Sequence, residues 1–548
     1  MKLGLSLLSL SLLSTPSLAQ GWDIQPLAVV GSPVAGVGAI TQIRDLAINN
    51  GPDWRVEVST DAPSDSNLVV IGPSGVILQK GQALPLPAGS TIRRFDSLSL
   101  DVHGNIASKL SLDATVGTGD DTGVYRDATL LVQEGSPTTA GAFSPGTPYR
   151  ILYNVKLADN GDVLVLASVD DPALASSTDQ VLMRLATTAG GALASETALW
   201  KEGDLIPGTS GQITSFATGA HMFDMNDAGA VIFFADTTLP SGTDGFIMLD
   251  GLVLAQEGQP APVAGRTWLG LGSPETTLNN LGGHAYTGVL SGDFTTNTLI
   301  ARNGAKFRQE GDPVPGLPAF QLTGFGSGPL DLANTGELLW FGNWDDPDTS
   351  IDEGLFVEDQ LIVQEGVTMV GAQVIATVRG DEDQYAISDD GNHVIFEAIL
   401  ADGTSGAFLA TRPAGVAVFP GCFAEEGSLT VVSGLPVQGT TMQLRYSNPS
   451  PITGVRQLGL SGVSWAGPTG CGVFVPGIGE LLIGILPQDL LILPAGVHTG
   501  ADAVLPLPIT SDPAFLGITL YLQGVYLFPS DPLDPVDLTN AVAITISA

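Results

Sequence analysis

The chain has 548 residues, of which 44% are hydrophobic, so it is long and apolar enough to bury the cores of two or more domains and is not a disordered protein. Its 57 acidic and 20 basic residues give a net charge of −37, which makes phosphate backbones and anionic lipid surfaces repulsive and excludes nucleic-acid binding. Aromatic residues make up only 6%, whereas 69 glycines and 37 prolines favour many short strands joined by turns over long helices.

The N-terminus has the pattern of a secretory signal peptide over residues 1–19. A positively charged start is followed by an apolar run at residues 3–13 and by the cleavage pattern Ser17-Leu18-Ala19. We therefore predict that the mature chain begins near Gln20 and is secreted or lies at the cell surface. A second apolar stretch, at residues 481–496, is interrupted by two prolines and an aspartate, so no transmembrane segment is predicted in the mature chain.

A sequence unit recurs over most of residues 40–410, and its first marker is a polar turn closed by glycine and followed by an apolar strand. The turn glycines are Gly51, Gly104, Gly161, Gly229, Gly282, Gly336 and Gly391. They are 53, 57, 68, 53, 54 and 55 residues apart, which indicates seven copies of one structural unit. In each turn Asp or Asn bonds the backbone and glycine accepts a positive φ, so the turns repeat for backbone reasons.

Two further strands follow each turn. The second strand appears seven times, as in SNLVVIG and DGFIML. The third ends in a Glu-Gly phrase whose glycine is Gly135, Gly203, Gly258, Gly311 or Gly366, with a divergent copy at Gly81. The last unit, ending in SGAFLAT, lacks its own third strand, whereas a spare copy, LAVVGSPVAG, precedes the first unit.

This offset predicts a closed ring in which residues 27–30 pair with the last unit near Phe408. We therefore predict an all-β chain whose residues 20–413 form a seven-bladed β-propeller, closed by the N-terminal strand. The fourth strand of each blade would come from segments such as RRFDSLSLD, RILYNVKLA and SFATGAHMFDM. The single long interval is assigned to residues 186–197, a small-residue insertion expected as a mobile surface loop.

The recurring glutamates Glu134, Glu202, Glu257, Glu310 and Glu365 have two interpretations. In the favoured one, glycine permits a bend and each glutamate accepts hydrogen bonds from exposed backbone amides. In the other, five equivalent carboxylates line the central channel and bind a cation, which would offset their mutual repulsion. Catalysis requires unlike groups in unlike places, so a symmetric ring of glutamates favours a structural role.

The repeat resembles the bacterial family of exported tandem-repeat proteins named for the pattern NxxGxxAF. NNLGGHAY from Asn279 matches with Tyr286 in the aromatic place, and NDAGAVIF from Asn226 matches with Ile232 in place of Ala. Other copies depart from the pattern, with Ser388, Ala333 and Ala158 standing where it has Asn. The resemblance implies export and a repeated architecture, and it carries no activity.

Residues 414–548 do not contain the repeat. Their sequence has about eight apolar strand patterns, which predict a β-sandwich. The chain's two cysteines, Cys422 and Cys471, both fall here, and in an oxidising compartment they predict one disulfide. The layout is similar to a C-terminal domain of many secreted bacterial proteins, on the segments Gly421-Cys422, 458–461, Gly470-Cys471, 516–523 and 539–541. That resemblance implies a portable module for surface retention or sorting.

No GxSxG elbow, HExxH zinc helix or P-loop occurs in the sequence. The five histidines, at 103, 221, 284, 393 and 498, are scattered and are expected as turn or surface residues. No catalytic, cofactor-binding or metal residue is predicted. The alternative is calcium bound by the acidic loop residues Asp345, Asp346, Asp348 and Asp352.

Three functional hypotheses follow. The favoured one is an exported non-catalytic binding or scaffold protein with a protein or glycan partner at the cell surface, because repeats of similar polar chemistry make a platform more readily than an active site. The second is a carbohydrate-active or other hydrolytic propeller, for which Trp200, Trp268, Trp340 and Trp344 would supply sugar-stacking surfaces. The third is a structural component of the cell envelope, attached through the C-terminal module.

Overall fold

The computed structural model describes residues 22–546 with gaps at 51–52, 114, 116, 118, 175–178, 272–273, 382, 413–415, 420–426, 434–435, 438, 449, 451, 465–471, 476–478, 485–489, 512–514, 516–517 and 531–535. The predicted signal peptide at residues 1–19 and the predicted disulfide between Cys422 and Cys471 lie outside the described residues. Within them the strands pair antiparallel, and a short 3-10 turn, η1 (Phe294–Thr296), connects two of them. The all-β prediction is confirmed. No helix in this part of the chain has the length and apolarity needed to cross a membrane.

Residues 23–411 form seven sheets, which we number 1 to 7 in chain order. Sheet 1 contains β2 (Pro33–Val34), β3 (Gly38–Ile48), β4 (Trp54–Thr60), β5 (Leu68–Gly72) and β6 (Gly75–Gln79). Sheet 2 contains β7 (Thr91–Leu100), β8 (Ile106–Asp113), β9 (Thr122–Arg126) and β10 (Thr129–Gln133). Sheet 3 contains β11 (Tyr149–Leu157), β12 (Val163–Val169), β13 (Gln180–Thr187) and β14 (Leu193–Lys201).

Sheets 4 to 7 follow the same order. Sheet 4 contains β15 (Ile213–Phe216), β16 (Phe223–Met225), β17 (Val231–Thr237), β18 (Gly245–Leu249) and β19 (Leu252–Gln256), and sheet 5 contains β20 (Trp268–Gly270), β21 (Thr276–Leu278), β22 (His284–Leu290), β23 (Thr298–Arg302) and β24 (Ala305–Gln309). Sheet 6 contains β25 (Pro313–Val314), β26 (Leu317–Gly324), β27 (Asp331–Leu332), β28 (Leu338–Trp344), β29 (Glu353–Val357) and β30 (Gln360–Gln364). Sheet 7 contains β31 (Met369–Val370), β32 (Gln373–Val378), β33 (Tyr385–Ile387), β34 (His393–Leu400) and β35 (Ser405–Thr411), with β1 (Asp23–Val29) at its edge.

The three predicted strand types occur in every sheet. The strand after each polar turn, for example β12 and β28, pairs on one side with a strand that precedes the turn and on the other side with the strand that follows it. The fourth type precedes the turn and is one strand in sheets 1 to 3 but two pieces in sheets 4 to 7. Glycine or proline between the two pieces, at Gly219, Pro274, Pro329 and Gly380, accounts for the interruption, because these residues weaken or remove ladder hydrogen bonds.

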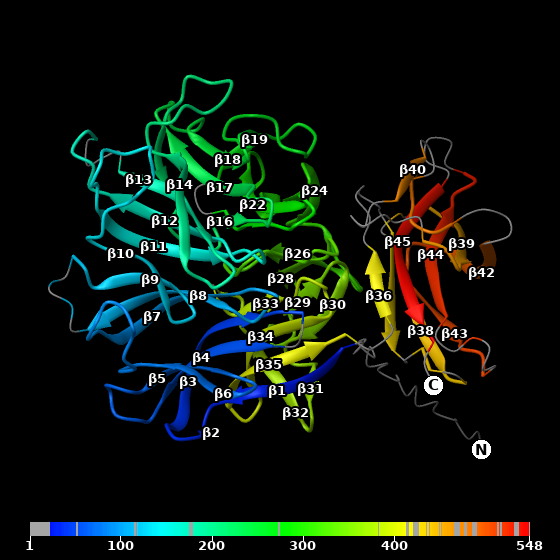
Figure 1. Ribbon diagram of the computed structural model, residues 1–548. Coiled ribbons are helices and arrows are strands. Elements are labelled where there is room, and N and C mark those ends of the chain that lie inside the picture. The colour runs from blue at the N-terminus through cyan, green and yellow to red at the C-terminus, as the bar shows by residue number, and fades with distance from the viewer. Residues whose placement is uncertain are drawn as a thin grey trace, which may run out of the picture.

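The N-terminal strand pairs with the last repeat, as the strand offset predicts. β1 runs antiparallel to β35 with Asp23 opposite Thr411, Pro26 opposite Phe408 and Val29 opposite Gly406. Figure 1 shows this strand, in blue, beside the yellow β35. The two ends of the repeat region therefore meet in one sheet.

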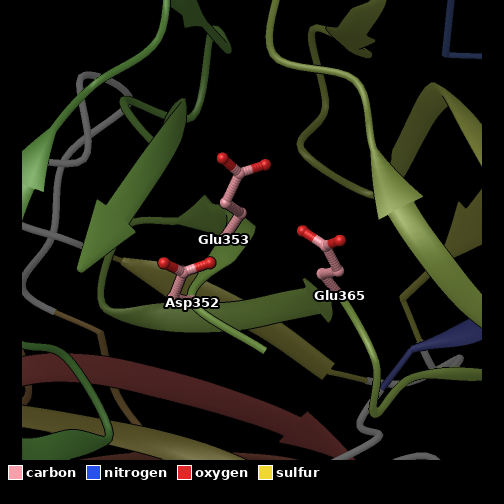
Figure 2. Close-up of side chains that lie close together, drawn as sticks. All are labelled: Asp352, Glu353 and Glu365. Atoms are coloured by element: carbon pink, nitrogen blue, oxygen red, sulfur yellow. The ribbon is translucent and has the colours of Figure 1, made fainter. Parts of the chain in front are cut away.

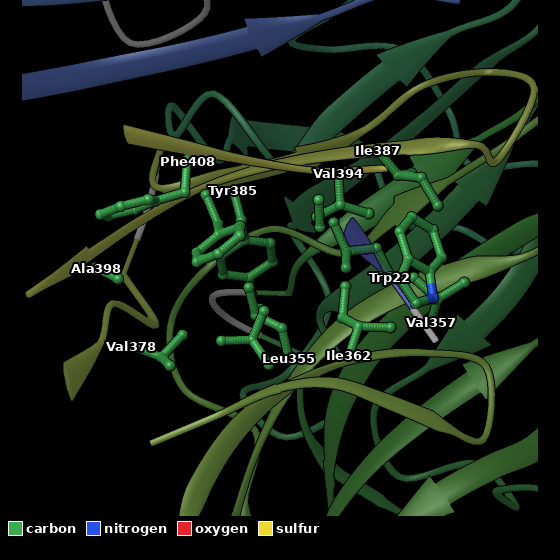
Figure 3. Close-up of a cluster of buried hydrophobic side chains, with 14 of the residues drawn as sticks. Trp22, Leu355, Val357, Ile362, Val378, Tyr385, Ile387, Val394, Ala398 and Phe408 are labelled. Carbon is green, nitrogen blue, oxygen red and sulfur yellow. The ribbon is translucent and has the colours of Figure 1, made fainter. Parts of the chain in front are cut away.

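The hydrophobic core is divided among the spaces between consecutive sheets. In the described part of the chain seven buried clusters lie between neighbouring sheets, one for each pair, including the pair formed by sheets 7 and 1. Figure 3 shows the cluster between sheets 6 and 7, where Leu355 and Ile362 face Val394 and Phe408 and where Trp22 also packs. Strands between two such clusters are buried on both faces, which explains continuous apolar runs such as VLVLASV in β12.

The expectation of a mobile loop at residues 186–197 is wrong. Strands β13 and β14 extend through this segment, with Arg184 opposite Thr197 and Ala186 opposite Ser195. The turn between them is closed by the Thr188 amide, which donates to the Ala192 carbonyl at 2.8 Å. The segment is small-residue and polar, but a long hairpin satisfies its backbone groups better than an open loop.

The C-terminal segment, residues 416–546, forms separate sheets. Its strands are β36 (Val416–Phe419), β37 (Ser428–Ser433), β38 (Thr441–Ser447), β39 (Gly454–Ser461), β40 (Val473–Val475), β41 (Gly479–Leu481), β42 (Leu490–His498), β43 (Ala503–Pro508), β44 (Thr519–Leu527) and β45 (Val536–Thr545). A five-stranded sheet, β36-β45-β44-β39-β42, and a three-stranded sheet, β37-β38-β43, bury one shared apolar cluster that includes Leu444, Leu458 and Val542. The predicted strand patterns at β37, β38, β39, β43, β44 and β45 are therefore present and contribute to this core.

Substitution of Ala28 by aspartate tests the closure of sheet 7 by β1. Ala28 is buried between sheets 7 and 1, so a carboxylate there would lose its water without gaining a partner. We expect Ala28→Asp to lower the free energy of unfolding by roughly 2–5 kcal/mol in chemical denaturation. The matched variant Gln25→Asp, on the exposed face of the same strand, should change it little. Equal stability of the two variants would contradict the closure.

Candidate functional site

The strands that directly precede the polar turns, one from each of the seven sheets, surround one central cavity. Strands β3, β7, β11, β16, β21, β27 and β33 contact one another in that order, and β33 contacts β3. The cavity has a volume of about 180 Å³ and is lined by residues of all seven sheets. Its position makes it the place where side chains from every repeat meet.

The first polar residue of the repeated turn holds the turn itself. Asn226 Oδ1 accepts hydrogen bonds from the amides of Ala228 and Ala230, at 3.1 and 3.0 Å. Gly229 follows with a φ of +79°, which a residue with a side chain adopts only under strain. The predicted backbone role of these turns is confirmed.

The turns are also hydrogen-bonded to one another from sheet to sheet, and this connection was not predicted. Each of the seven junctions between sheets has a bond of this kind. They are Asn49 Nδ2 to Asp101 O (3.0 Å), Val102 N to Asp159 Oδ1 (2.9 Å), Asn160 N to Asp227 Oδ1 (2.9 Å), Asp227 N to Asn280 Oδ1 (2.8 Å), Asn280 N to Asn334 Oδ1 (2.8 Å), Asn334 N to Asp389 O (2.7 Å) and Asp390 N to Asn50 Oδ1 (2.8 Å). The bonds form a closed ring at one end of the cavity.

A second level of bonds between sheets lies deeper in the cavity, two residues before the turns. Asp224 accepts the Leu278 amide at 2.9 Å, and Asp331 accepts the Ile387 amide at 2.8 Å. Ser99 and Thr277 accept backbone amides of the next sheet in the same way, at 3.0 and 3.1 Å. The carboxylates of Asp224 and Asp331 therefore hold neighbouring sheets together.

Two hydrogen bonds cross the cavity between sheets that are not neighbours. Asn280 Nδ2 of sheet 5 donates to Asp159 Oδ2 of sheet 3 at 3.0 Å, at the level of the turns. His221 Nε2 of sheet 4 lies 2.8 Å from Asp383 Oδ1 of sheet 7, toward the other end. These two bridges obstruct the cavity at two levels.

The cavity is strongly acidic, and its carboxyl groups have different environments. Burial raises the pKa of Asp45 well above its usual range, and the Asp383 and Glu57 carboxylates add to the effect. Burial also raises the pKa of Asp224 and Asp331, against the opposing charge of Lys156. Burial acts in the same direction on Asp383, but the hydrogen bond and charge of His221 hold the pKa of that group below its usual value.

The repeated glutamates lie away from this cavity, at the ends of the outer strands. Glu202 accepts the Gln180 amide at 2.8 Å, and Glu310 accepts the Asn297 and Thr298 amides at 3.0 and 2.8 Å. Glu257 accepts the amides of Gly245 and Leu271, at 3.3 and 2.9 Å, and Glu134 accepts that of Leu152 at 3.3 Å. The structural interpretation is confirmed for these four, and none of the five lines the cavity.

Glu365 departs from the pattern of the other four. Its carboxylate lies beside those of Asp352 and Glu353, as Figure 2 shows, and one oxygen from each of the three lies within 4.8 Å of the others. Burial raises the pKa of Glu365 to about 7, and the charges of Glu353 and Asp352 contribute. Burial and neighbouring carboxylates also raise the pKa of Asp352 and Glu353.

The acidic loop predicted as a calcium site is not assembled in that form. Asp345 accepts the Gln321 amide at 2.7 Å, Asp346 accepts the Asp348 amide at 2.9 Å, and Asp348 caps Ser350. Only Asp352 of the four belongs to a group of carboxylates close enough to share an ion, within the described residues. Asp346 and Asp348 stabilise their own loop, and Asp345 bonds the backbone of β26.

Other predicted site residues also have structural positions. Trp268, Trp340 and Trp344 are buried in the cores between sheets, so these three tryptophans form no sugar-stacking surface. Trp200 is half-buried and packs on Phe233. The expectation that every histidine is a turn or surface residue is wrong for His498, which is fully buried in the C-terminal segment. His221 stands in a turn, as expected, and lines the cavity. A signal was present for the latter, because His221 and Asp383 both lie five residues before the first residue of their turns, Asn226 and Ser388.

One known protein family matches the repeat region. The family described as "Family of unknown function (DUF7453)" matches residues 22–414. The chain belongs to this family. A comparison with curated proteins found no match.

Several solved structures resemble the chain at low identity. Trypanosoma rangeli sialidase is 9% identical, with 97% of this chain and 96% of that chain covered and a TM-score of 0.24. The polysaccharide lyase Uly1 is 9% identical, with 97% and 98% covered and a TM-score of 0.18. Salmonella alpha-2-macroglobulin reacted with methylamine is 11% identical, with 96% of this chain but 38% of that chain covered and a TM-score of 0.17. TM-scores this low carry no argument about fold or activity.

Replacement of Asn280 by alanine tests the ring of turns. The change removes the acceptor for the Asp227 amide and the donor to Asp159, and it leaves both partners partly buried. We expect Asn280→Ala to lower the free energy of unfolding by roughly 1–3 kcal/mol. Gln373→Ala, at an exposed strand position, should change it little. Thermal and chemical denaturation of the two variants would measure the difference.

The acidic cavity predicts a pH dependence of stability. Burial raises the pKa of Asp389 from 3.8 to about 8, with Asp159 and Asp331 the next largest causes. A carboxyl group whose pKa is raised on folding stabilises the fold at low pH, and this contribution is lost as the pH rises through about 8. We therefore expect the free energy of unfolding to fall between about pH 5 and about pH 9.

The variant Asp389→Asn separates this group from the others. The amide does not titrate, so the fall in stability between the two pH values should become smaller, and the variant should exceed the native protein in stability at about pH 9. An unchanged pH profile in urea denaturation would show that Asp389 does not contribute.

Proposed function

We propose that residues 20–413 form a seven-bladed β-propeller closed by the N-terminal strand and that residues 414–548 form a β-sandwich. Two observations support the first part. The strands that directly precede the polar turns contact one another in a closed cycle, and one buried core lies between each pair of consecutive sheets. The second part is supported by the apolar cluster that the five-stranded and three-stranded sheets of the C-terminal segment share.

We further propose that the chain is an exported non-catalytic binding or scaffold protein, secreted or held at the cell surface. The observation that carries this proposal is the obstructed cavity. A volume of about 180 Å³ is small beside the roughly 300–1,000 Å³ of ligand pockets, and the His221–Asp383 and Asn280–Asp159 bridges cross it. Two of the cavity's carboxylates, Asp224 and Asp331, accept backbone amides from neighbouring sheets.

In this proposal recognition belongs to the loops at the edges of the blades, which vary from repeat to repeat while the sheets hold them in place. The partner is a protein or a glycan of the cell surface. The resemblance of the C-terminal segment to modules of secreted bacterial proteins supports a role in surface retention. An envelope component attached in this way would use the same two parts without a soluble ligand.

A hydrolytic function is the second candidate, and one observation favours it. Asp45 and Asp383 line the same cavity, and their pKa values are shifted in opposite directions. Two carboxyl groups held in different protonation states are the arrangement that general acid and base catalysis requires. The obstructing bridges would then have to open for a substrate.

One experiment separates the two candidates. The full-length mature protein is applied to a glycan array and to cell-surface extracts, and both bound partners and released products are measured. The proposal expects binding without products, and it expects Asp45→Asn and Asp383→Asn to keep that binding because both groups line the cavity. Products that disappear in the two variants would contradict the non-catalytic proposal and support hydrolysis.

A further inference from the structure

A groove lies between sheets 7 and 1, beside the strand β1 that joins them. Residues of β3 form one wall, and residues of β34, of β35 and of the loop between β32 and β33 form the other. Its volume of about 420 Å³ falls in the range of roughly 300–1,000 Å³ that is typical of ligand pockets. Seven of its nine lining residues are polar or charged, which suits a ligand with hydrogen-bonding groups.

Two arginines line the groove without a bound carboxylate. In the described part of the chain nine other arginines form ion pairs, whereas Arg44 and Arg379 form none. Arg44 Nε donates to Ser59 Oγ at 2.6 Å, and Arg379 Nε is buried with no hydrogen-bond partner among the described residues. Carboxylates are abundant in a chain with 57 acidic and 20 basic residues. Two guanidinium groups left unpaired in one groove therefore indicate an anionic ligand.

The two sheets beside the groove also differ from the rest in the strand after the turn. Glu57 and Glu397 are buried there, six residues after their turn glycines. The other five repeats have a small or apolar residue at this place: Leu110, Ala167, Ala235, Gly288 and Gly342. Burial raises the pKa of both glutamates, and the charges of Arg44 and Arg379 oppose the effect, each in its own sheet. Charged groups are thus concentrated at this one junction between sheets.

The charge of the groove selects a ligand with one negative group. Its lining contains the two arginines and one carboxylate, Glu397, which leaves one net positive charge when that carboxylate is ionised. Ser405 Oγ donates to Glu397 Oε1 at 3.1 Å and holds the carboxylate against the wall. A guanidinium group presents a planar fork of donors that matches a carboxylate or a sulfate. The net charge of −37 on the whole chain disfavours a ligand with many negative groups.

The uncharged polar residues of the groove match the hydroxyl groups of a sugar. Thr41 and Gln42 are exposed on β3, and Gln384 is half-buried on the opposite wall. Gln384 Oε1 accepts the Asp381 amide at 3.2 Å, which directs its amide nitrogen elsewhere as a donor. Hydroxyl and amide groups both donate and accept, as sugar hydroxyls do.

We propose that this groove binds a sugar unit carrying one anionic group, a carboxylate or a sulfate, through Arg44 and Arg379. The inference rests on the proposed function, because it names the ligand class for recognition of a glycan. The site lies at the junction that the N-terminal strand closes. Val30, which directly follows β1, lines the groove, and its amide donates to the Ser405 carbonyl at 2.8 Å. The ligand therefore contacts both ends of the repeat region.

The test is titration of the full-length mature protein with glucuronate, with glucose sulfate and with glucose, followed by ligand-observed NMR. We expect at least one anionic sugar to bind about tenfold more tightly than glucose, because hydrogen bonds to charged groups contribute more than neutral ones. The tighter of the two identifies the anionic group. Arg44→Gln and Arg379→Gln should each weaken its binding about tenfold or more. Both should leave Tm nearly unchanged without sugar, because these guanidinium groups hold no carboxylate of the described chain.

Arg150→Gln is the matched control, since Arg150 is an exposed arginine of sheet 3 that pairs with Asp179 and lies outside the groove. It removes the same charge and should keep the affinity of the native protein. Arg379→Lys keeps the charge but loses the planar fork, so its affinity should fall between those of the native protein and Arg379→Gln. No binding of either anionic sugar, or binding that both glutamine variants retain in full, would overturn the proposal. Acetate or sulfate ions that bind as tightly as the sugars would overturn its sugar part.

The glycan array separates this inference from the proposed function. Array binding that Arg44→Gln and Arg379→Gln retain would overturn the site and leave the binding role intact. Binding of the free anionic sugars by a protein that finds no partner on the array or in cell-surface extracts would support the site and contradict the binding role at the surface.

Discussion

The hydrogen bonds between neighbouring turns fix how the seven sheets sit against one another, and the rest of the structure depends on them. The cores between sheets are apolar, and apolar contact alone has little directional preference. The turn bonds are directional, and they repeat at every junction, including the one between Asp390 and Asn50. Adjacent residues of one turn therefore have different roles. Asn226 accepts a hydrogen bond from its own turn, and Asp227 donates its amide to the next sheet.

The strands could be predicted because their signals are local. Glycine-closed turns, apolar runs and the unmatched strand at the N-terminus gave the sheets, their order and the pairing of β1 with β35. The candidate site was harder to predict from the sequence, because its contacts join residues that are far apart in the chain. His221 and Asp383 hold equivalent places before their turns, but nothing in the sequence indicates that these two residues, 162 positions apart, meet across the cavity. The loop pattern around Asp345 likewise gave no sign that Glu353 and Glu365 meet.

The repeat is uniform where it builds the sheets and varied where it faces the cavity. At the position two residues before the turn, the seven copies have Ala47, Ser99, Lys156, Asp224, Thr277, Asp331 and Ala386. Lys156 has the opposite charge to its neighbours and lowers the cost of their ionisation. Sheet 6 also differs from the other sheets at its outer end, where the carboxylates of Asp352, Glu353 and Glu365 lie close together. Differences among otherwise equivalent copies are therefore the places where specific chemistry resides.

The pairing of β1 with β35 joins residues almost 390 positions apart, from Asp23 to Thr411. Such a long loop is entropically unfavourable to close, and the two edges stay unpaired until the whole repeat has been synthesised. During that interval the β1 segment of one molecule is as good a match for β35 of another as for its own. Strand exchange between two nascent copies is thus a built-in hazard of this architecture, and crowded synthesis at high expression would favour interlocked dimers.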